Sequence, residues 1–241
     1  MRQVFSEFPW IHSPSPRAFL PLFQRYGHFE TLHPGQAIYN GGTDGEVAWI
    51  LSGLCGFQMT DAQDRAQLFT LVPAGRLIGN VDAYTGAVVN IIDYALRPTE
   101  VLLLSRHAFL SCLQRDRVLN DEHTVMLVRE HESDMEGFFS IVHDSLEVKV
   151  VRLLAALIFR DVPRLTFHWG SALENFSPTP IPFSLSVTEI AKTVNASRTA
   201  VSLIMNQWIK DGLLLDKEDA RWVTKALLMK ANDWLSPVIP Q

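Results

Sequence analysis

The chain is poor in cysteine. Cys55 and Cys112 are the only thiols among its 241 residues. Two thiols are too few for a disulfide scaffold, for a zinc site with four thiolate ligands, or for an iron–sulfur cluster with four cysteine ligands from one chain. With 47% hydrophobic residues, the sequence instead predicts a fold that is stabilised by a hydrophobic core.

Long hydrophobic runs and a signal peptide are absent as well. The most apolar window, VVRLLAALIF at residues 150–159, has the length of a buried helix, whereas a membrane span needs about twenty apolar residues. Near the N-terminus, Glu7 and several prolines stand where a signal peptide needs an unbroken apolar segment. We therefore expect a cytoplasmic protein with reduced thiols and no membrane partner.

Neither sign of charge dominates. The chain has 21 Lys and Arg against 26 Asp and Glu, a formal net charge of −5. The total therefore does not indicate a nucleic-acid or membrane partner. The distribution is uneven, because residues 185–241 have seven basic and six acidic side chains and the remainder has a net charge of −6.

The first half of the chain has the pattern of a small all-β domain. Turns that contain glycine, proline or asparagine separate short segments of strand character, which lie at 36–39, 47–51, 55–59, 68–72, 88–95 and 101–104. This spacing predicts a small barrel or jelly roll. A metal enzyme on such a barrel would need a His-x-His pair with a nearby glutamate, and the sequence has no His-x-His. We therefore expect no metal, no cofactor and no enzymatic activity.

The pattern becomes helical at about residue 118. Five residues follow one another at alternating spacings of three and four positions, namely Val128, His131, Met135, Phe138 and Val142. Four of them are apolar or aromatic, and this spacing is typical of the contact positions, or seam, of a coiled coil. This pattern favours a dimerisation helix, with packing against its own barrel as the alternative. A second, broadly apolar helix is expected over 146–159. Residues 160–183, with four prolines, are expected to form a loop.

Residues 184–214 contain the signals of two short helices. Ser186 and Glu189 form a capping box that starts a helix at about Val187. Asn195 stands where a tight turn between helices needs a left-handed residue. Ser197 is the expected cap of a second helix, which runs over 197–211 until Gly212 ends it.

The two helices predict a helix-turn-helix, whose second helix enters the major groove of DNA. Ala191 allows the helices to approach closely, and the expected inner residues of the second helix are Val201, Ile204, Met205 and Trp208. The expected DNA-binding residues are Thr188, Ser197, Arg198, Thr199, Ser202, Leu203 and Asn206. Strands at 213–215 and 221–224 would add a β-hairpin wing. An interaction module that binds protein through this unit is the alternative.

Three segments together resemble the CRP/FNR family of bacterial transcription regulators. They are LHPGQAIYNGGTDGEVAWILSGLCGF (32–57), PAGRLIGN (73–80) and SRTAVSLIMNQWIKDGLL (197–214). The resemblance implies an α+β fold with a double-stranded β-helix or jelly-roll barrel, a long dimerisation helix and a C-terminal winged helix-turn-helix. The corresponding domains are residues 1–117, 118–145 and 146–241. The resemblance also implies a transcription regulator that binds a palindromic operator in double-stranded DNA as a homodimer, with RNA polymerase as a candidate further partner.

The chain departs from the family pattern at the residues that bind cyclic nucleotides. Family members that bind them have a glutamate after the barrel glycine and an arginine further along. Here Asn80 occupies the glutamate position, and residues 87–92 contain no arginine. A buried phosphodiester would be left without its cation, which is costly. We therefore expect that the barrel does not bind cyclic AMP, and its effector is unknown.

The recognition helix departs from the family pattern too. Arg198 matches the first DNA-facing arginine of the family, which suits a guanine or a phosphate. Thr199 stands where glutamate is frequent. Leu203 stands where arginine is frequent, so the base contact open to it is a thymine methyl group. The operator is therefore expected to differ from the common family consensus.

Three hypotheses for the barrel remain open at this stage. It binds an apolar or planar ligand against Val88, Val89, Ile91 and Ile92, it senses oxidants through Cys55 or Cys112, or it has lost sensing and serves as a dimer scaffold. Thiol sensing requires an exposed sulfur with a low pKa.

Overall fold

The structure is a computed structural model that describes residues 4–38, 45–60, 63, 66–85, 91–162, 169–217 and 220–231. Contacts divide the chain into a barrel unit, His12–His131, and a second unit formed by Met1–Ile11 and Glu132–Gln241. The division differs from the expected boundary after residue 117. Helix α4 (Arg117–His143) is continuous and contributes residues to both units, and the N-terminal segment packs in the second unit.

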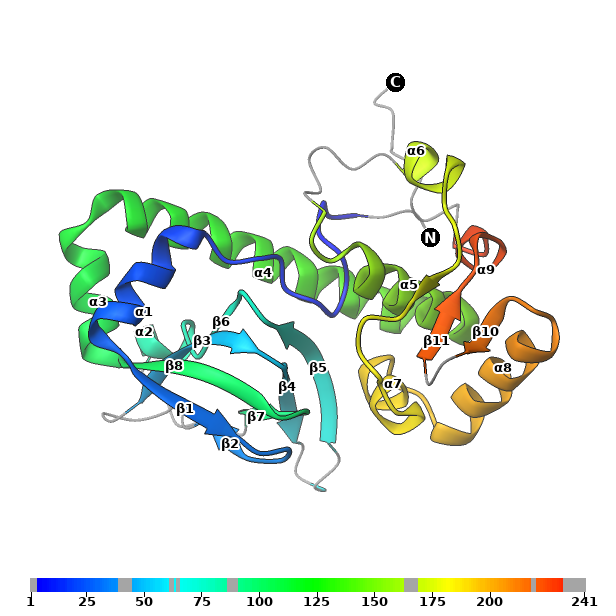
Figure 1. The fold of residues 1–241 in the computed structure, drawn as a ribbon, viewed down its shortest axis with the longest axis horizontal. Helices are drawn as coiled ribbons and strands as arrows, with labels where there is room; N and C mark the ends of the chain where they lie inside the picture. The colour runs from blue at the N-terminus through cyan, green and yellow to red at the C-terminus, as the bar shows by residue number, and fades with distance from the viewer. Residues whose placement is uncertain are drawn as a thin grey trace. The chain divides into compact units, whose positions relative to one another are not determined.

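The barrel unit consists of two antiparallel four-stranded sheets, with strand orders β1-β8-β3-β6 and β2-β7-β4-β5 (Figure 1). The predicted jelly-roll barrel is thus confirmed. Its strands are β1 (His28–Leu32), β2 (Ala37–Ile38), β3 (Glu46–Ser52), β4 (Leu54–Thr60), β5 (Ala66–Pro73), β6 (Leu77–Ile78), β7 (Ile91–Ala95) and β8 (Thr99–Ser105). The predicted segments include neither β1 nor β6, and residues 39 and 88–90 of two predicted strands lie outside the described residues.

Alternation along the strands produces two hydrophobic clusters on opposite faces of the first sheet. Ala48 and Ile50 face the second sheet, in a cluster that includes Cys55. Val47 and Trp49 belong to the other cluster, which helices cover. This arrangement follows from the two-residue period of a strand.

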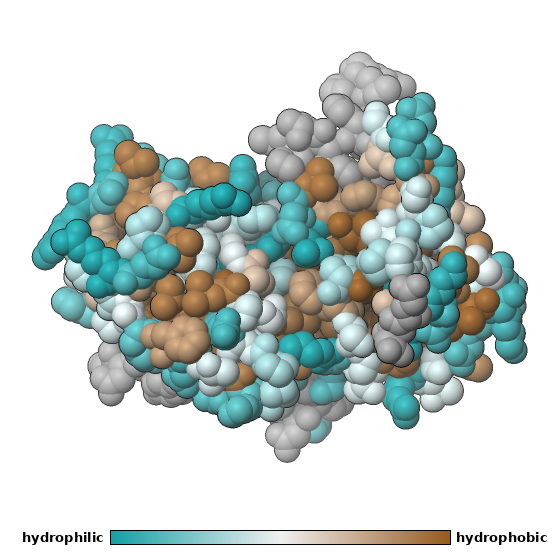
Figure 2. Space-filling view, viewed as in Figure 1, coloured by the Kyte–Doolittle hydropathy of each residue, from teal (hydrophilic) through white to brown (hydrophobic). Residues whose placement is uncertain are grey.

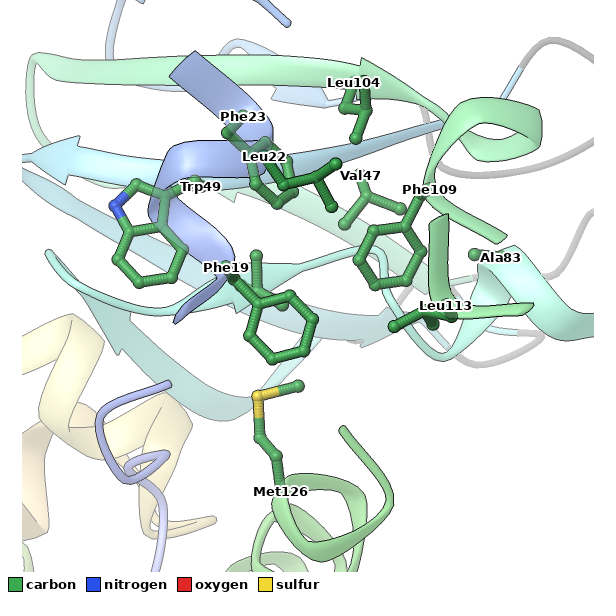
Figure 3. Close-up of a cluster of buried hydrophobic side chains, with 11 residues drawn as sticks. Phe19, Leu22, Phe23, Val47, Trp49, Ala83, Leu104, Phe109, Leu113 and Met126 are labelled. Atoms are coloured by element: carbon green, nitrogen blue, oxygen red, sulfur yellow. The ribbon is translucent and has the colours of Figure 1, made fainter. Parts of the chain in front are cut away.

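The cluster that includes Val47 and Trp49 is covered by helices that the strand pattern does not predict. They are η1 (Arg17–Phe19), α1 (Leu20–Tyr26), α2 (Asp82–Thr85) and α3 (Arg106–Arg115). Ser105 caps α3, and Phe109 and Leu113 then place the apolar face of this helix in the cluster. Met126 of α4 points toward Phe19 in the same cluster (Figure 3).

In the second unit, α4 is followed by α5 (Leu146–Phe159) after a break at Asp144 and Ser145. Ser145 caps α5 through a hydrogen bond from Val148 N. The expectation of a loop over 160–183 was partly wrong, because the segment contains α6 (Trp169–Glu174) and β9 (Thr179–Pro180). Within the part of the chain that the structure describes, strand β9 pairs with β11 alone, and a proline is tolerated in such an edge strand.

The last elements that the structure describes form a winged helix-turn-helix (Figure 1). Its elements are α7 (Val187–Thr193), α8 (Arg198–Lys210), β10 (Leu214–Lys217), β11 (Ala220–Val223) and α9 (Lys225–Met229). Strands β10 and β11 form the predicted wing, and β9 adds a third strand to it. Among the described residues, no helix is both long and apolar enough to cross a membrane.

Candidate nucleic-acid interface

Local hydrogen bonds define the two helices and the turn between them. Ser186 Oγ accepts a bond from Glu189 N (3.1 Å), and Ser186 N donates to Glu189 Oε2 (2.7 Å). Asn195 adopts a φ of 50°, in the left-handed region, and Ser197 Oγ accepts a bond from Ala200 N (3.1 Å). The predicted capping box, turn residue and second cap are therefore present in the structure.

The inner face of α8 is anchored in the second unit. Val201, Met205 and Trp208 are at most 2% exposed, whereas Ile204, also expected on the inner face, is half-buried. Ala191 of α7 is 3% exposed and its carbonyl oxygen accepts a bond from Ala196 N. This packing leaves the opposite face of α8 to solvent.

Most of the sequence-predicted DNA-binding residues lie on that face of α8 or at the beginning of this helix, and Thr188 lies on α7. Leu203 is 66% exposed and Ser202 is half-buried. The other five are exposed, namely Thr188, Ser197, Arg198, Thr199 and Asn206. The surface over α7 and the beginning of α8 is coloured from white to teal in Figure 2, which agrees with polar side chains there. The face offers a cation, hydroxyl groups, a carboxamide and one apolar side chain.

A hydrogen-bond network that the sequence did not suggest holds α8 against α5. Trp208 Nε1 donates to Glu147 Oε1 (3.1 Å), and Lys230 Nζ lies 2.9 Å from the same oxygen. Hydrogen bonds from Lys230 and Trp208 hold the pKa of Glu147 below its usual value. No local sequence pattern connects Glu147 with its two partners, because Trp208 lies 61 positions further along the chain and Lys230 lies further still.

The expected dimerisation residues follow α4. Val128, Phe138 and Val142 are 50–55% exposed, His131 is exposed and Met135 is half-buried. Other positions of α4 are buried within the chain, among them Met126, Ser133 and Ser140. The helix therefore packs against its own chain on one face and leaves the seam residues exposed or half-buried.

Asn80 contacts a polar side chain of α4 beside a small cavity in the barrel unit. Asn80 is 3% exposed and its Nδ2 donates to Glu130 Oε2 (3.1 Å), while Glu130 Oε1 lies 3.6 Å from His12 Nδ1. These three residues line a cavity of about 40 Å³. Among the described residues, no group of His, Cys, Asp and Glu side chains could hold a metal ion.

The candidate sensor residues of the barrel unit differ in their exposure to solvent. Cys55 is buried between the sheets, and burial, followed by the negative charge of Asp93, raises the pKa of its thiol to about 12. Cys112 on α3 is half-buried. Ile92 is 43% exposed. Val88, Val89 and the side chain of Ile91 lie outside the described residues.

No protein-family model matches the chain, and no curated protein matches it. Solved structures do. FixK2 from Bradyrhizobium japonicum has a TM-score of 0.69 at 13% identity, over 88% of this chain and 99% of that chain. A CooA mutant from Carboxydothermus hydrogenoformans has a TM-score of 0.67 at 13% identity, over 98% of this chain and 100% of the other.

A third similar structure is a transcriptional regulator of the CRP/FNR family from Thermus thermophilus, TTHA1359. It has a TM-score of 0.63 at 15% identity, over 85% of this chain and 98% of that chain. The resemblance inferred from the sequence motifs is thus confirmed for the fold. The chain has the fold of CRP/FNR-family transcription regulators, in which a jelly-roll barrel, a long helix and a winged helix-turn-helix follow one another.

Proposed function

We propose that this chain is a DNA-binding transcription regulator and not an enzyme, and that it acts in the cytoplasm. The observation that carries the proposal is the outward face of α8. Thr199, Ser202, Leu203 and Asn206 lie away from the side of the helix that is buried at Val201, Met205 and Trp208. Arg198 is exposed in the first turn of the same helix. A helix supported in this way can enter the major groove with its N-terminal residues at the base edges. Residues 1–117, 118–145 and 146–241 would then serve as sensor, dimerisation and DNA-binding parts.

Arg198 is the residue that we expect to contribute most to base recognition. Selection of bound sequences from random DNA should yield an operator, and Arg198→Ala should then weaken its binding by about 1–3 kcal/mol and relax the preference at one base pair. Fluorescence anisotropy with the selected DNA measures both effects. Arg115→Ala is the matched control, because it removes an exposed arginine from the end of α3 in the barrel unit. Equal binding by the Arg198→Ala protein would contradict the role of Arg198.

The salt dependence of binding separates this proposal from a protein-interaction module. Each phosphate contact releases counterions, so the logarithm of the DNA affinity should fall linearly with the logarithm of the salt concentration. If the selection enriches no DNA sequence and the protein binds no DNA at any salt concentration, the proposal of a regulator is rejected in favour of a module that binds a protein partner.

We also propose that the protein is a homodimer joined through α4 and that it binds a palindromic operator. A seam of exposed apolar residues on a long helix is the feature that supports this. Two copies would present two recognition helices to two half-sites. RNA polymerase remains a candidate further partner.

Phe138→Glu should weaken this dimer. Phe138 is half-exposed in one chain, and a carboxylate in its place would be buried against the partner helix without a cation. We expect a loss of about 2 kcal/mol, or roughly thirtyfold in the dissociation constant, which sedimentation velocity over a concentration series measures. Phe29→Glu is the control, since Phe29 is 57% exposed on β1. An unmodified protein that sediments as a monomer at all concentrations would rule out the seam.

We propose further that the barrel does not bind cyclic AMP. The described residues beside Asn80 leave a cavity of about 40 Å³, whereas sites for small ligands have volumes of about 300–1,000 Å³. A thiol-based signal would have to use Cys112, because the buried Cys55 keeps its proton and the thiolate is the reactive form.

A further inference from the structure

Leu203 is the apolar exception on the outward face of α8. Its side chain is 66% exposed, more than that of any other large hydrophobic residue among those described. Its neighbours one turn away are Thr199 and Asn206, both exposed. Since Val201 and Met205 bury the opposite side of the helix, Leu203 has no role in the packing of its own unit.

The major groove offers one apolar group to such a side chain. All four bases present hydrogen-bonding atoms there, but only thymine adds a methyl group, at its carbon 5. Leucine has no donor or acceptor. Placed against a guanine or cytosine edge, it would remove water from polar atoms without replacing the hydrogen bonds, which is unfavourable.

We propose that Leu203 reads a thymine in each operator half-site through the thymine 5-methyl group. This inference rests on the proposed function, because it needs α8 in the major groove. Leu203 lies five residues after Arg198, which is about 7.5 Å along the helix axis. That length corresponds to about two base-pair steps of 3.4 Å, so the thymine is expected about two base pairs from the pair that Arg198 contacts.

The test replaces each thymine of the selected operator in turn by deoxyuridine. This exchange removes only the methyl group and leaves the hydrogen-bonding atoms unchanged. Loss of one buried methyl contact should weaken binding of the unmodified protein about fourfold, equivalent to about 0.8 kcal/mol, at one thymine per half-site. Uridine at the other thymines should leave the affinity unchanged.

The same base exchange is then measured with the Leu203→Ala protein, which gives a double-mutant cycle between the side chain and the methyl group. This protein should bind the thymine and deoxyuridine operators equally at the sensitive position, because the side chain that contacts the methyl group is gone. Thr199→Ala is the matched control on the same face, and it should keep the fourfold difference. Circular dichroism should be unchanged by either substitution, since both side chains are exposed.

A second arm adds the methyl group back in a different base pair. Replacing the sensitive thymine–adenine pair by cytosine–guanine should weaken binding, and 5-methylcytosine at that position should recover about fourfold for the unmodified protein but not for Leu203→Ala. This arm separates recognition of the methyl group from recognition of hydrogen-bonding atoms.

The outcomes distinguish the inference from the proposed function. If no operator is selected, the regulator itself is rejected. If an operator is bound but no thymine is sensitive to uridine, or if Leu203→Ala keeps the sensitivity, the regulator stands and the thymine contact is overturned.

Discussion

Replacing Arg152 with methionine should lower the free energy of unfolding of the second unit by about 3–5 kcal/mol. Arg152 is 1% exposed on α5, and its Nη1 lies 2.8 Å from Asp144 Oδ2 and 3.6 Å from Glu136 Oε1. Burial lowers the pKa of the guanidinium to about 10, with the two carboxylates acting in the opposite direction, so it stays charged at neutral pH. Methionine fills a similar volume and leaves both buried carboxylates without their cation.

The cost arises from the uncompensated carboxylates and not from the loss of attraction alone. Glu136 also accepts hydrogen bonds from Val4 N and Phe5 N (both 3.0 Å), and Asp144 accepts one from Ser140 Oγ (2.7 Å). Because these polar groups keep the carboxylates in place, the two negative charges would remain close together. Adding Glu136→Gln and Asp144→Asn to Arg152→Met should therefore recover much of the lost stability.

Tryptophan fluorescence during urea unfolding measures this effect. Of the five tryptophans among the described residues, four belong to the second unit and only Trp49 lies in the barrel unit. Lys230→Ala is the control, since it breaks the partly exposed ion pair with Glu147 and should cost at most about 1 kcal/mol. If Arg152→Met changed stability no more than Lys230→Ala, the buried network would have no structural importance.

The helix-turn-helix could be predicted from sequence because its signals are local. A capping box spans Ser186 to Glu189, the turn depends on Asn195 alone, and the outward face of α8 follows from the 3.6-residue period. The structure contains each of these features at the predicted residues. Only Ile204, between the buried and outward faces, is less buried than expected.

The contacts that sequence analysis missed join distant segments. The prolines of residues 160–183 predict a loop, yet Pro180 pairs with Trp222 at the edge of the wing. Arg152 is a single charge within an apolar segment of the sequence, and its partners lie on α4 and at the α4–α5 break. Pairings of this kind depend on topology, which no window of the sequence encodes.

The N-terminal segment also makes contacts with residues that are distant in the sequence. It precedes the barrel in sequence but packs in the second unit, where Ser133 Oγ donates to the carbonyl oxygens of Phe8 (2.7 Å) and Ile11 (3.1 Å). Trp10 is 1% exposed and adopts a φ of 61°, a left-handed conformation that costs about 1–2 kcal/mol. Packing of the indole against α4 must offset this cost. Trp10→Ala should consequently destabilise the second unit by about 3–5 kcal/mol.

The contact between Trp10 and α4 can be tested at Gly137, through the sign of the stability change that Gly137→Ala causes. Replacing a glycine within a helix by alanine normally stabilises it by about 1 kcal/mol. Here a Cβ on residue 137 would lie 2.9 Å from both Cδ1 and Nε1 of Trp10, and a rigid indole ring cannot yield locally. Gly137→Ala should therefore destabilise the unmodified protein by about 1–3 kcal/mol, as overpacking does.

The same substitution should become stabilising once the indole is removed. In the Trp10→Ala background, the Cβ at residue 137 meets no ring, so the ordinary preference of a helix for alanine should return. Gly170→Ala in α6 is the control, because a Cβ there has nothing within 4 Å, and it should be neutral or slightly stabilising in both backgrounds. Urea unfolding of the four proteins gives the coupling energy between residues 10 and 137. Effects of Gly137→Ala with the same sign in both backgrounds would mean that Trp10 does not pack on α4 in solution.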